Sequence, residues 1–250
     1  MKLLRCGQCN VRTYCSKECQ TADWQDTHSE WCNEWYAPLR DHAHALSGDQ
    51  SAWRNLVSWI EFHDTALLNA AIAQYVRMKA ALPQLDVTKE CVLEVVVEYR
   101  TDPGLPAEKR FKVVNLGMSR PVPGVICSAQ PDLDIHAAMS VYRDDIESIA
   151  EDREQALAGE RTYWGTGAYL ILARFAPNIE VNQLIPFWSH FNIDIVLGTA
   201  TPACRNALDQ LKEVLDEGKK VHQCCGDLMR GRGGCSLTVG ASDLAVAGRG

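Results

Sequence analysis

Residues 6–32 read CGQCNVRTYCSKECQTADWQDTHSEWC and contain five cysteines and one histidine. These residues are spaced as C-x2-C-x5-C-x3-C-x8-H-x3-C. Structural zinc takes four such ligands in a tetrahedron, and a C-x2-C turn supplies two of them. The spacing therefore predicts a zinc finger with these candidate ligands: Cys6, Cys9, Cys15, Cys19, His28 and Cys32.

Spacing alone leaves two ligand sets open. Cys15 and Cys19 are four residues apart, as are His28 and Cys32, so each pair lies on one face of a helix. Either pair can complete a site begun by the C-x2-C turn, in a sequential or an interleaved arrangement. Thiol redox chemistry at that turn is disfavoured, because no strand precedes it and no βαβ unit surrounds it.

The same stretch resembles the MYND-type zinc finger. The resemblance rests on the C-x2-C turn, the string Tyr14-Cys-Ser-Lys-Glu-Cys-Gln20, and then Trp24, His28 and Cys32. It implies two interleaved zinc sites and a role in protein–protein interaction. One zinc would be held by Cys6, Cys9, His28 and Cys32, and the other by Cys15, Cys19 and an earlier C-x2-C pair. The remaining chain is loosely similar to fungal proteins with such a finger.

The earlier pair of the resembled pattern is not among the five residues before Cys6. We expect that the chain starts inside its finger and that the upstream reading frame encodes the missing pair. Two alternatives stay open. The second zinc is lost, or distant residues complete it, for which the candidates are His222, Cys224 and Cys225.

Two aromatic residues of the finger have a structural and a functional interpretation. Tyr14 and Trp24 are expected to form the small core that a zinc module packs between its ligands. Alternatively, Gln20 and Trp24 line a groove for a peptide partner, as the resemblance suggests.

The composition is that of a soluble globular protein. The chain has 250 residues and a net charge of −7, with 25 basic residues against 32 acidic ones. The negative balance makes nucleic acid an unexpected partner. No apolar run reaches the roughly 18 residues of a membrane span, and no signal peptide is visible. Eleven cysteines without a secretion signal favour metal binding over disulfides, so we expect an intracellular protein of the nucleus or cytoplasm.

Residues 33–82 are predicted to be helical. The breaker Ser47-Gly48-Asp49 separates two helical segments, a further helix opens with Asp64 as its N-cap, and Pro83 ends it. Strands are expected at residues 90–99 and 111–118 as an antiparallel hairpin, and then at 168–175, 179–185 and 193–197. A long helix is expected over 135–157, and a last helix begins at Thr201 and stops at Gly218.

These expectations define an α+β protein. A zinc finger (1–32) precedes an α+β body (33–225), in which helices flank an antiparallel sheet, and a flexible Gly-rich tail (226–250) follows.

No P-loop, nucleophile-elbow or H-E-x-x-H motif occurs in the body. Gly165-Thr-Gly167 is interpreted as turn glycine, and His63-Asp64 as exposed residues at a helix end. We therefore expect a zinc-binding protein that mediates protein–protein interaction, without enzymatic activity. The alternative is an enzyme of unidentified class with its active site in the α+β body.

Overall fold

The computed structural model describes residues 3–120, 126–127, 130–135, 138–140, 161–180, 183–196 and 206–221. Its N-terminal elements are β1 (Leu4–Arg5), β2 (Thr13–Tyr14), α1 (Lys17–Asp23), the π-helical turns η1 (Trp24–His28) and η2 (Trp31–Tyr36), and α2 (Ala37–Ser47). The later elements are α3 (Ala52–Ala81), α4 (Val87–Glu90), β3 (Val92–Tyr99), the 3-10 turn η3 (Ala107–Lys109), β4 (Phe111–Ser119), β5 (Ile126–Cys127), β6 (Gln130–Asp134), β7 (Arg161–Arg174), β8 (Ile185–Val196) and α6 (Ala207–Glu217).

The main sheet has four strands in the order β4-β3-β7-β8. This confirms the α+β class, but the expectation of a purely antiparallel sheet is wrong. β3 pairs with β7 in parallel, with Leu93 opposite Tyr169. Parallel neighbours need a long connection, and β3 and β7 are separated by β4, β5 and β6 along the chain.

The predicted hairpin of β3 and β4 is confirmed, with Tyr99 opposite Phe111 in an antiparallel pair. In β3, Leu93, Val95 and Val97 are fully buried, while the residues between them are partly exposed. This alternation follows from the two-residue repeat of a strand that buries one face.

The second half of the sheet differs from the prediction. The expected strand at 179–185 is wrong, because β8 begins at Ile185 and runs through the segment predicted as a separate strand at 193–197. Asn178, with φ of 58°, lies in the connection between β7 and β8. Pro186 is tolerated inside β8 because β8 lies at one edge of this sheet, where a missing N–H does not break a ladder bond.

The helix α3 packs against β3, β4 and β7 of the main sheet. Its 30 residues correspond to about 45 Å of helix. The predicted break at Ser47-Gly48-Asp49 is confirmed, since Gly48 ends α2 with a φ of 68°. The predicted N-cap at Asp64 is wrong, because α3 passes through this position without interruption.

The interpretation of His63 and Asp64 as exposed residues at a helix end is also wrong. His63 is 1% exposed and its Nε2 lies 3.2 Å from the carbonyl oxygen of Glu108. Asp64 is partly buried and accepts a hydrogen bond from Tyr169. Both side chains therefore face packed elements of the body.

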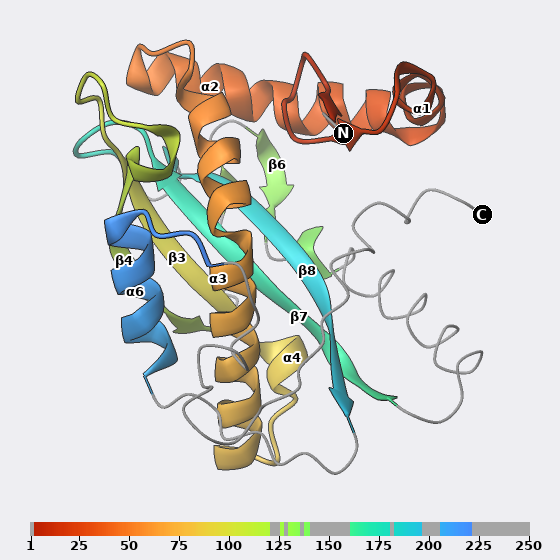
Figure 1. Ribbon diagram of the computed structural model, residues 1–250, viewed down its shortest axis with the longest axis vertical. Helices are drawn as coiled ribbons and strands as arrows, with labels where there is room; N and C mark the ends of the chain where they lie inside the picture. Colours follow the sequence, from red (N-terminus) through yellow and green to blue (C-terminus); the bar gives the residue numbers. More distant parts are fainter. Residues whose placement is uncertain are drawn as a thin grey trace.

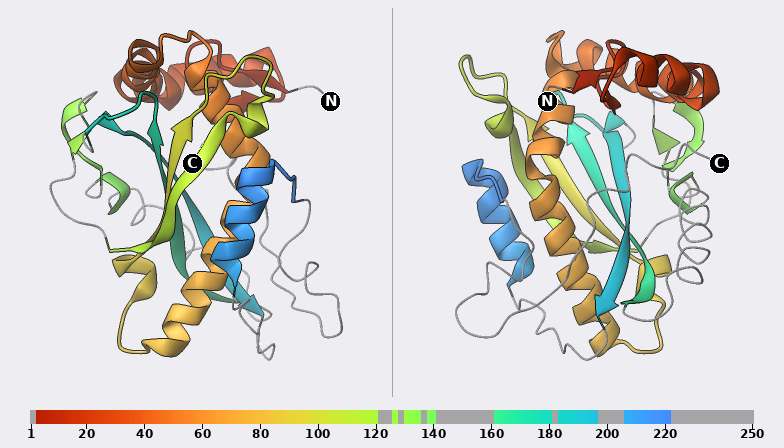
Figure 2. Two further views of the ribbon diagram at one scale, coloured as in Figure 1. Left: turned by 90° about the vertical axis from the view of Figure 1, so that its left-hand side faces the viewer. Right: turned by 45° about the vertical axis from the view of Figure 1, so that its right-hand side comes forward.

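α3 and α6 cover the same face of the sheet (Figure 2). α6 buries Ala207, Leu211 and Leu215 and ends, as predicted, at Gly218, which has a φ of 63°. Its predicted start at Thr201 lies outside the described residues.

Gly165 and Gly167 are strand residues, so their interpretation as turn glycines is wrong. Gly165 has a φ of 145° and lies where the β7–β8 register shifts. A Cβ atom on Gly167 would lie 2.7 Å from Cε2 of Tyr75 and 2.8 Å from Cε2 of Phe191. The absence of a side chain lets the Tyr75 ring of α3 approach the β7 backbone.

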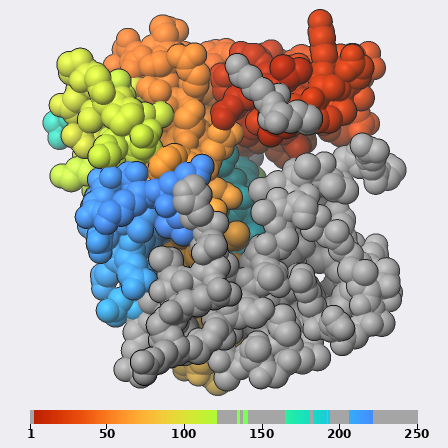
Figure 3. Space-filling model, viewed as in Figure 1, coloured from red at the N-terminus to blue at the C-terminus, as the bar shows by residue number. Residues whose placement is uncertain are grey.

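The N-terminal elements lie across one end of α3 and the sheet (Figure 1). In the space-filling view they form one end of the molecule, with α2 beside the finger (Figure 3). None of the described helices is long and apolar enough to cross a bilayer. Most of the predicted helix 135–157 and the whole tail 226–250 lie outside the described residues, and the predicted division of the chain stays a prediction.

Candidate metal centre

A two-stranded hairpin positions the C-x2-C turn. β1 and β2 pair with Leu4 opposite Tyr14. At the end of the hairpin, the Cys6 N–H donates to Arg12 O at 3.0 Å, and the Asn10 N–H donates to Cys6 O at 3.0 Å. Asn10 has a φ of 60°, a conformation that asparagine tolerates better than most residues. The turn therefore holds both of its cysteines at the base of the finger.

The other half of the finger is helical. Ser16 caps α1 by accepting from the Cys19 N–H at 3.2 Å. The helical segment continues through η1 and η2, whose π-helical turns carry His28 and Cys32, both completely buried. Such wide turns are uncommon and often occur at functional sites.

The structure brings together Cys6, Cys9, His28 and Cys32. Their four ligand atoms lie within 4.8 Å of one another. Cys6 Sγ lies 3.9 Å from Cys32 Sγ, and Cys9 Sγ lies 3.5 Å from His28 Nε2. Zinc bond lengths in a regular tetrahedron place two sulfur ligands about 3.8 Å apart and a sulfur and a nitrogen about 3.5 Å apart. The cluster therefore has the dimensions of a four-coordinate zinc site.

Burial keeps the imidazole of the cluster neutral but opposes the ionisation of two of its thiols. Burial raises the pKa of Cys9 and of Cys32, and lowers the pKa of His28. Burial also acts to raise the pKa of Cys6, but the backbone N–H groups of Cys9 and Gln8 outweigh it and lower that pKa. The imidazole is thus neutral and ready to coordinate, while a dication would stabilise the buried thiolates.

The expected small core of the finger is confirmed. Tyr14 packs with the cysteines of the cluster, and Trp24 packs against them. The Trp24 and His28 rings meet edge to face with centroids 5.7 Å apart, and Tyr14 Oη donates to Asp23 at 2.7 Å. Because His28 Nδ1 has no hydrogen-bond partner among the described residues, these ring contacts hold the imidazole in place.

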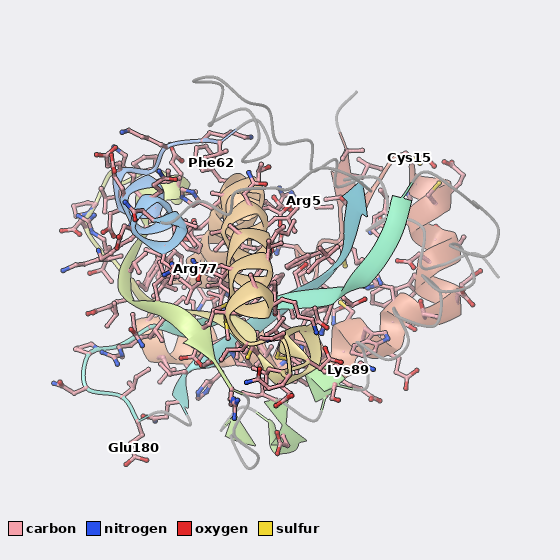
Figure 4. All side chains as sticks on the ribbon, turned by 90° about the horizontal axis from the view of Figure 1, so that it is seen from below. Arg5, Cys15, Phe62, Arg77, Lys89 and Glu180 are labelled. Carbon is pink, nitrogen blue, oxygen red and sulfur yellow. The ribbon has the colours of Figure 1, made fainter. Side chains whose placement is uncertain are left out.

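Cys15 and Cys19 lie outside the cluster. Their sulfur atoms are 3.1 Å apart, shorter than the roughly 3.8 Å expected for two thiolates on one zinc. Cys15 is exposed and lies at the finger's end away from α3 (Figure 4). The residues considered as distant partners, His222, Cys224 and Cys225, lie outside the described part of the chain.

Two body residues that bind the C-x2-C turn were missed by sequence reasoning. Trp53 Nε1 donates to Cys9 O at 2.6 Å, and Arg40 Nη1 donates to Gln8 O at 2.8 Å. No spacing rule connects them to the cysteines.

Three buried thiols and one buried imidazole, whose ligand atoms lie within 4.8 Å of one another on a short hairpin and a helix, define a zinc finger. Residues 1–32 match the family model of the MYND finger. MYND fingers bind zinc and generally mediate protein interactions. No curated protein and no solved structure matches the chain.

Proposed function

We propose that Cys6, Cys9, His28 and Cys32 hold one zinc ion and that the finger shaped by this ion binds a protein or peptide partner. The observation that carries the proposal is the buried cluster of four ligand atoms within 4.8 Å of one another. Four protein ligands occupy every position of a tetrahedral zinc, which leaves none for substrate or water. A closed site of this kind stabilises a fold instead of catalysing a reaction.

The surface of the finger supports a binding role. The large hydrophobic residues exposed in the described chain are Leu3, Leu4, Trp31, Leu82 and Val114, so three of the five belong to the finger. Trp31 is 45% exposed although it neighbours the buried Cys32. Exposed aromatic side chains are common anchors in interfaces. We propose that Trp31 contributes apolar contact to the partner.

The zinc assignment is tested by metal analysis of the purified chain. We expect about one zinc per chain, lost in Cys6→Ser and in His28→Ala, because each removes one of four ligands. His44→Ala is the matched control, since this histidine of α2 lies outside the cluster. Cys15→Ser should keep the zinc. Retention by His28→Ala together with loss in Cys15→Ser would instead support the sequential ligand set.

To test the binding role, the immobilised wild-type chain is used to capture a partner. The purified partner is then titrated against the wild type and the variants. We expect His28→Ala to abolish binding and Trp31→Ala to weaken it. Leu82→Ala should bind as the wild type, because this exposed leucine follows α3, outside the finger. A partner that binds His28→Ala as tightly as the wild type would contradict a role for the finger.

The described residues offer no observation that favours the enzyme alternative. A pocket between β4 and α6 is lined by Val113, Val114, Asn115, Leu116, Leu208, Asp209 and Lys212. We also propose that the protein is intracellular, because thiol ligands for zinc persist in reducing compartments.

A further inference from the structure

We propose that Trp53 and Arg40 are positioning residues of the zinc site. They come from the body helices α3 and α2, and they hold the peptide groups of the C-x2-C turn in the geometry that binds the metal. This inference rests on the proposed zinc site. It predicts that the body of the protein sets how tightly the finger retains its metal.

Trp53 acts on the second cysteine of the turn. It is completely buried at the start of α3, and its indole N–H reaches the carbonyl oxygen of Cys9. The same turn sends the Val11 N–H to Cys9 Sγ at 3.4 Å. The indole therefore fixes the backbone of the ligand residue Cys9, while the Val11 N–H fixes its sulfur. A buried carbonyl that lost this donor would be unsatisfied, which is costly.

Arg40 acts on the peptide between Gln8 and Cys9. Its guanidinium donates a hydrogen bond to the carbonyl oxygen of Gln8. The N–H group of the same peptide is that of Cys9, and it donates a hydrogen bond to the Cys6 sulfur. A cation on the carbonyl side polarises the peptide, which strengthens its N–H as a donor. Arg40 therefore supports the position of the Cys6 sulfur through one peptide group.

Other contacts join the same two parts. Val11 and Tyr36 pack against the core of the finger and against the core of the body. The Tyr36 and Trp53 rings lie 6.4 Å apart, and Arg5 of β1 forms an ion pair with Glu61 of α3. These contacts attach the C-x2-C turn to the body. Groups that orient metal ligands from outside the coordination sphere commonly change metal affinity by about 10- to 100-fold.

The first test compares Trp53→Phe with Trp59→Phe. Both tryptophans are fully buried in α3, but Trp59 Nε1 has no hydrogen-bond partner among the described residues and its ring packs on Phe111 of the body. Zinc affinity and zinc release are measured by competition with a chromogenic chelator. We expect Trp53→Phe to bind zinc about 10- to 100-fold more weakly. Trp59→Phe should bind it as the wild type, even if both variants lose similar thermal stability.

The second test avoids the core. Arg40→Met keeps the aliphatic stem and removes the donor to Gln8. Its control is Asp41→Asn, because Asp41 is an exposed partner of the other guanidinium nitrogens and does not contact the turn. Zinc release should accelerate severalfold in Arg40→Met and stay unchanged in Asp41→Asn.

The outcomes separate the two proposals. If the wild-type chain holds no zinc, the proposed function fails. If the wild type holds one zinc and Trp53→Phe and Arg40→Met release it at the wild-type rate, the positioning role is wrong while the zinc site stands. Equal weakening in Trp53→Phe and Trp59→Phe, with no effect of Arg40→Met, would also overturn the inference, because general loss of packing would then explain the change.

Discussion

Tyr169 Oη donates a hydrogen bond to Asp64 Oδ1 at 2.8 Å and thereby joins the middle of α3 to β7, across 105 residues of sequence. Tyr169 is 2% exposed and faces α3 from the sheet. Burial raises the pKa of Asp64, and the Tyr169 hydroxyl partly offsets this by bonding the ionised form. The pair is therefore a buried polar contact between α3 and the sheet, in addition to the bonds of the Tyr75 hydroxyl to Ala168 of β7.

Removing the Tyr169 hydroxyl should destabilise the protein. In Tyr169→Phe the Asp64 carboxylate loses its buried donor, so we expect a loss of about 2 kcal/mol in the free energy of unfolding at neutral pH. Denaturant unfolding measures it. A double-mutant cycle with Asp64→Ala, which removes the acceptor, separates the pair energy from the other effects of each change. Additive effects of the two substitutions would show that the contact contributes no stability.

Asp64→Asn should stabilise the protein at pH 7 but not in acid. Because the pKa of Asp64 is raised in the folded state, ionising the carboxyl costs stability as the pH rises above its ordinary value of 3.8. Asparagine keeps an acceptor for Tyr169 and removes that cost. The stability difference between variant and wild type should therefore be positive at pH 7 and vanish below about pH 4. A difference that does not change with pH would contradict this account.

The thiols of the finger should differ in reactivity. Cys15 is exposed, whereas Cys6, Cys9 and Cys32 are buried in the candidate metal centre. With N-ethylmaleimide and peptide mass mapping, we expect rapid labelling of Cys15. The three cluster cysteines should be labelled only after a chelator removes zinc, because bound thiolates are shielded. Cluster cysteines that react as fast as Cys15 in the zinc-loaded protein would exclude the proposed site.

Gly167→Ala should destabilise the sheet. The new methyl group would lie 2.7 Å from the Tyr75 ring and 2.8 Å from the Phe191 ring, and forcing it into this space costs about 1–3 kcal/mol. Gly117→Ala is the matched control, because Gly117 lies in β4 with open space where its Cβ would be. Thermal unfolding of both variants measures the effect. Equal melting temperatures would mean that the rings move aside without cost.

The kind of site and much of the local structure could be predicted from the amino-acid sequence. Zinc ligands are a small set of residue types, so their spacing from Cys6 to Cys32 is visible in the chain. The alternation in β3 and the stop of α6 at Gly218 are equally local, since each depends on the backbone preferences of adjacent residues. The resemblance to the MYND finger added the interleaved ligand set.

The contacts between distant segments could not be predicted in this way and depend on the folded chain. Spacing left two ligand sets open, and the folded finger brings His28 and Cys32, not Cys15 and Cys19, to the C-x2-C turn. Asp64 has the character of a helix start, yet α3 continues through it because packing overrides local propensity and Tyr169 supplies a donor from β7. The parallel pairing of β3 with β7 and the bond from Trp53 to Cys9 have the same origin. Each of these contacts depends on residues that become neighbours only when the chain folds, so no local sequence pattern predicts the contact.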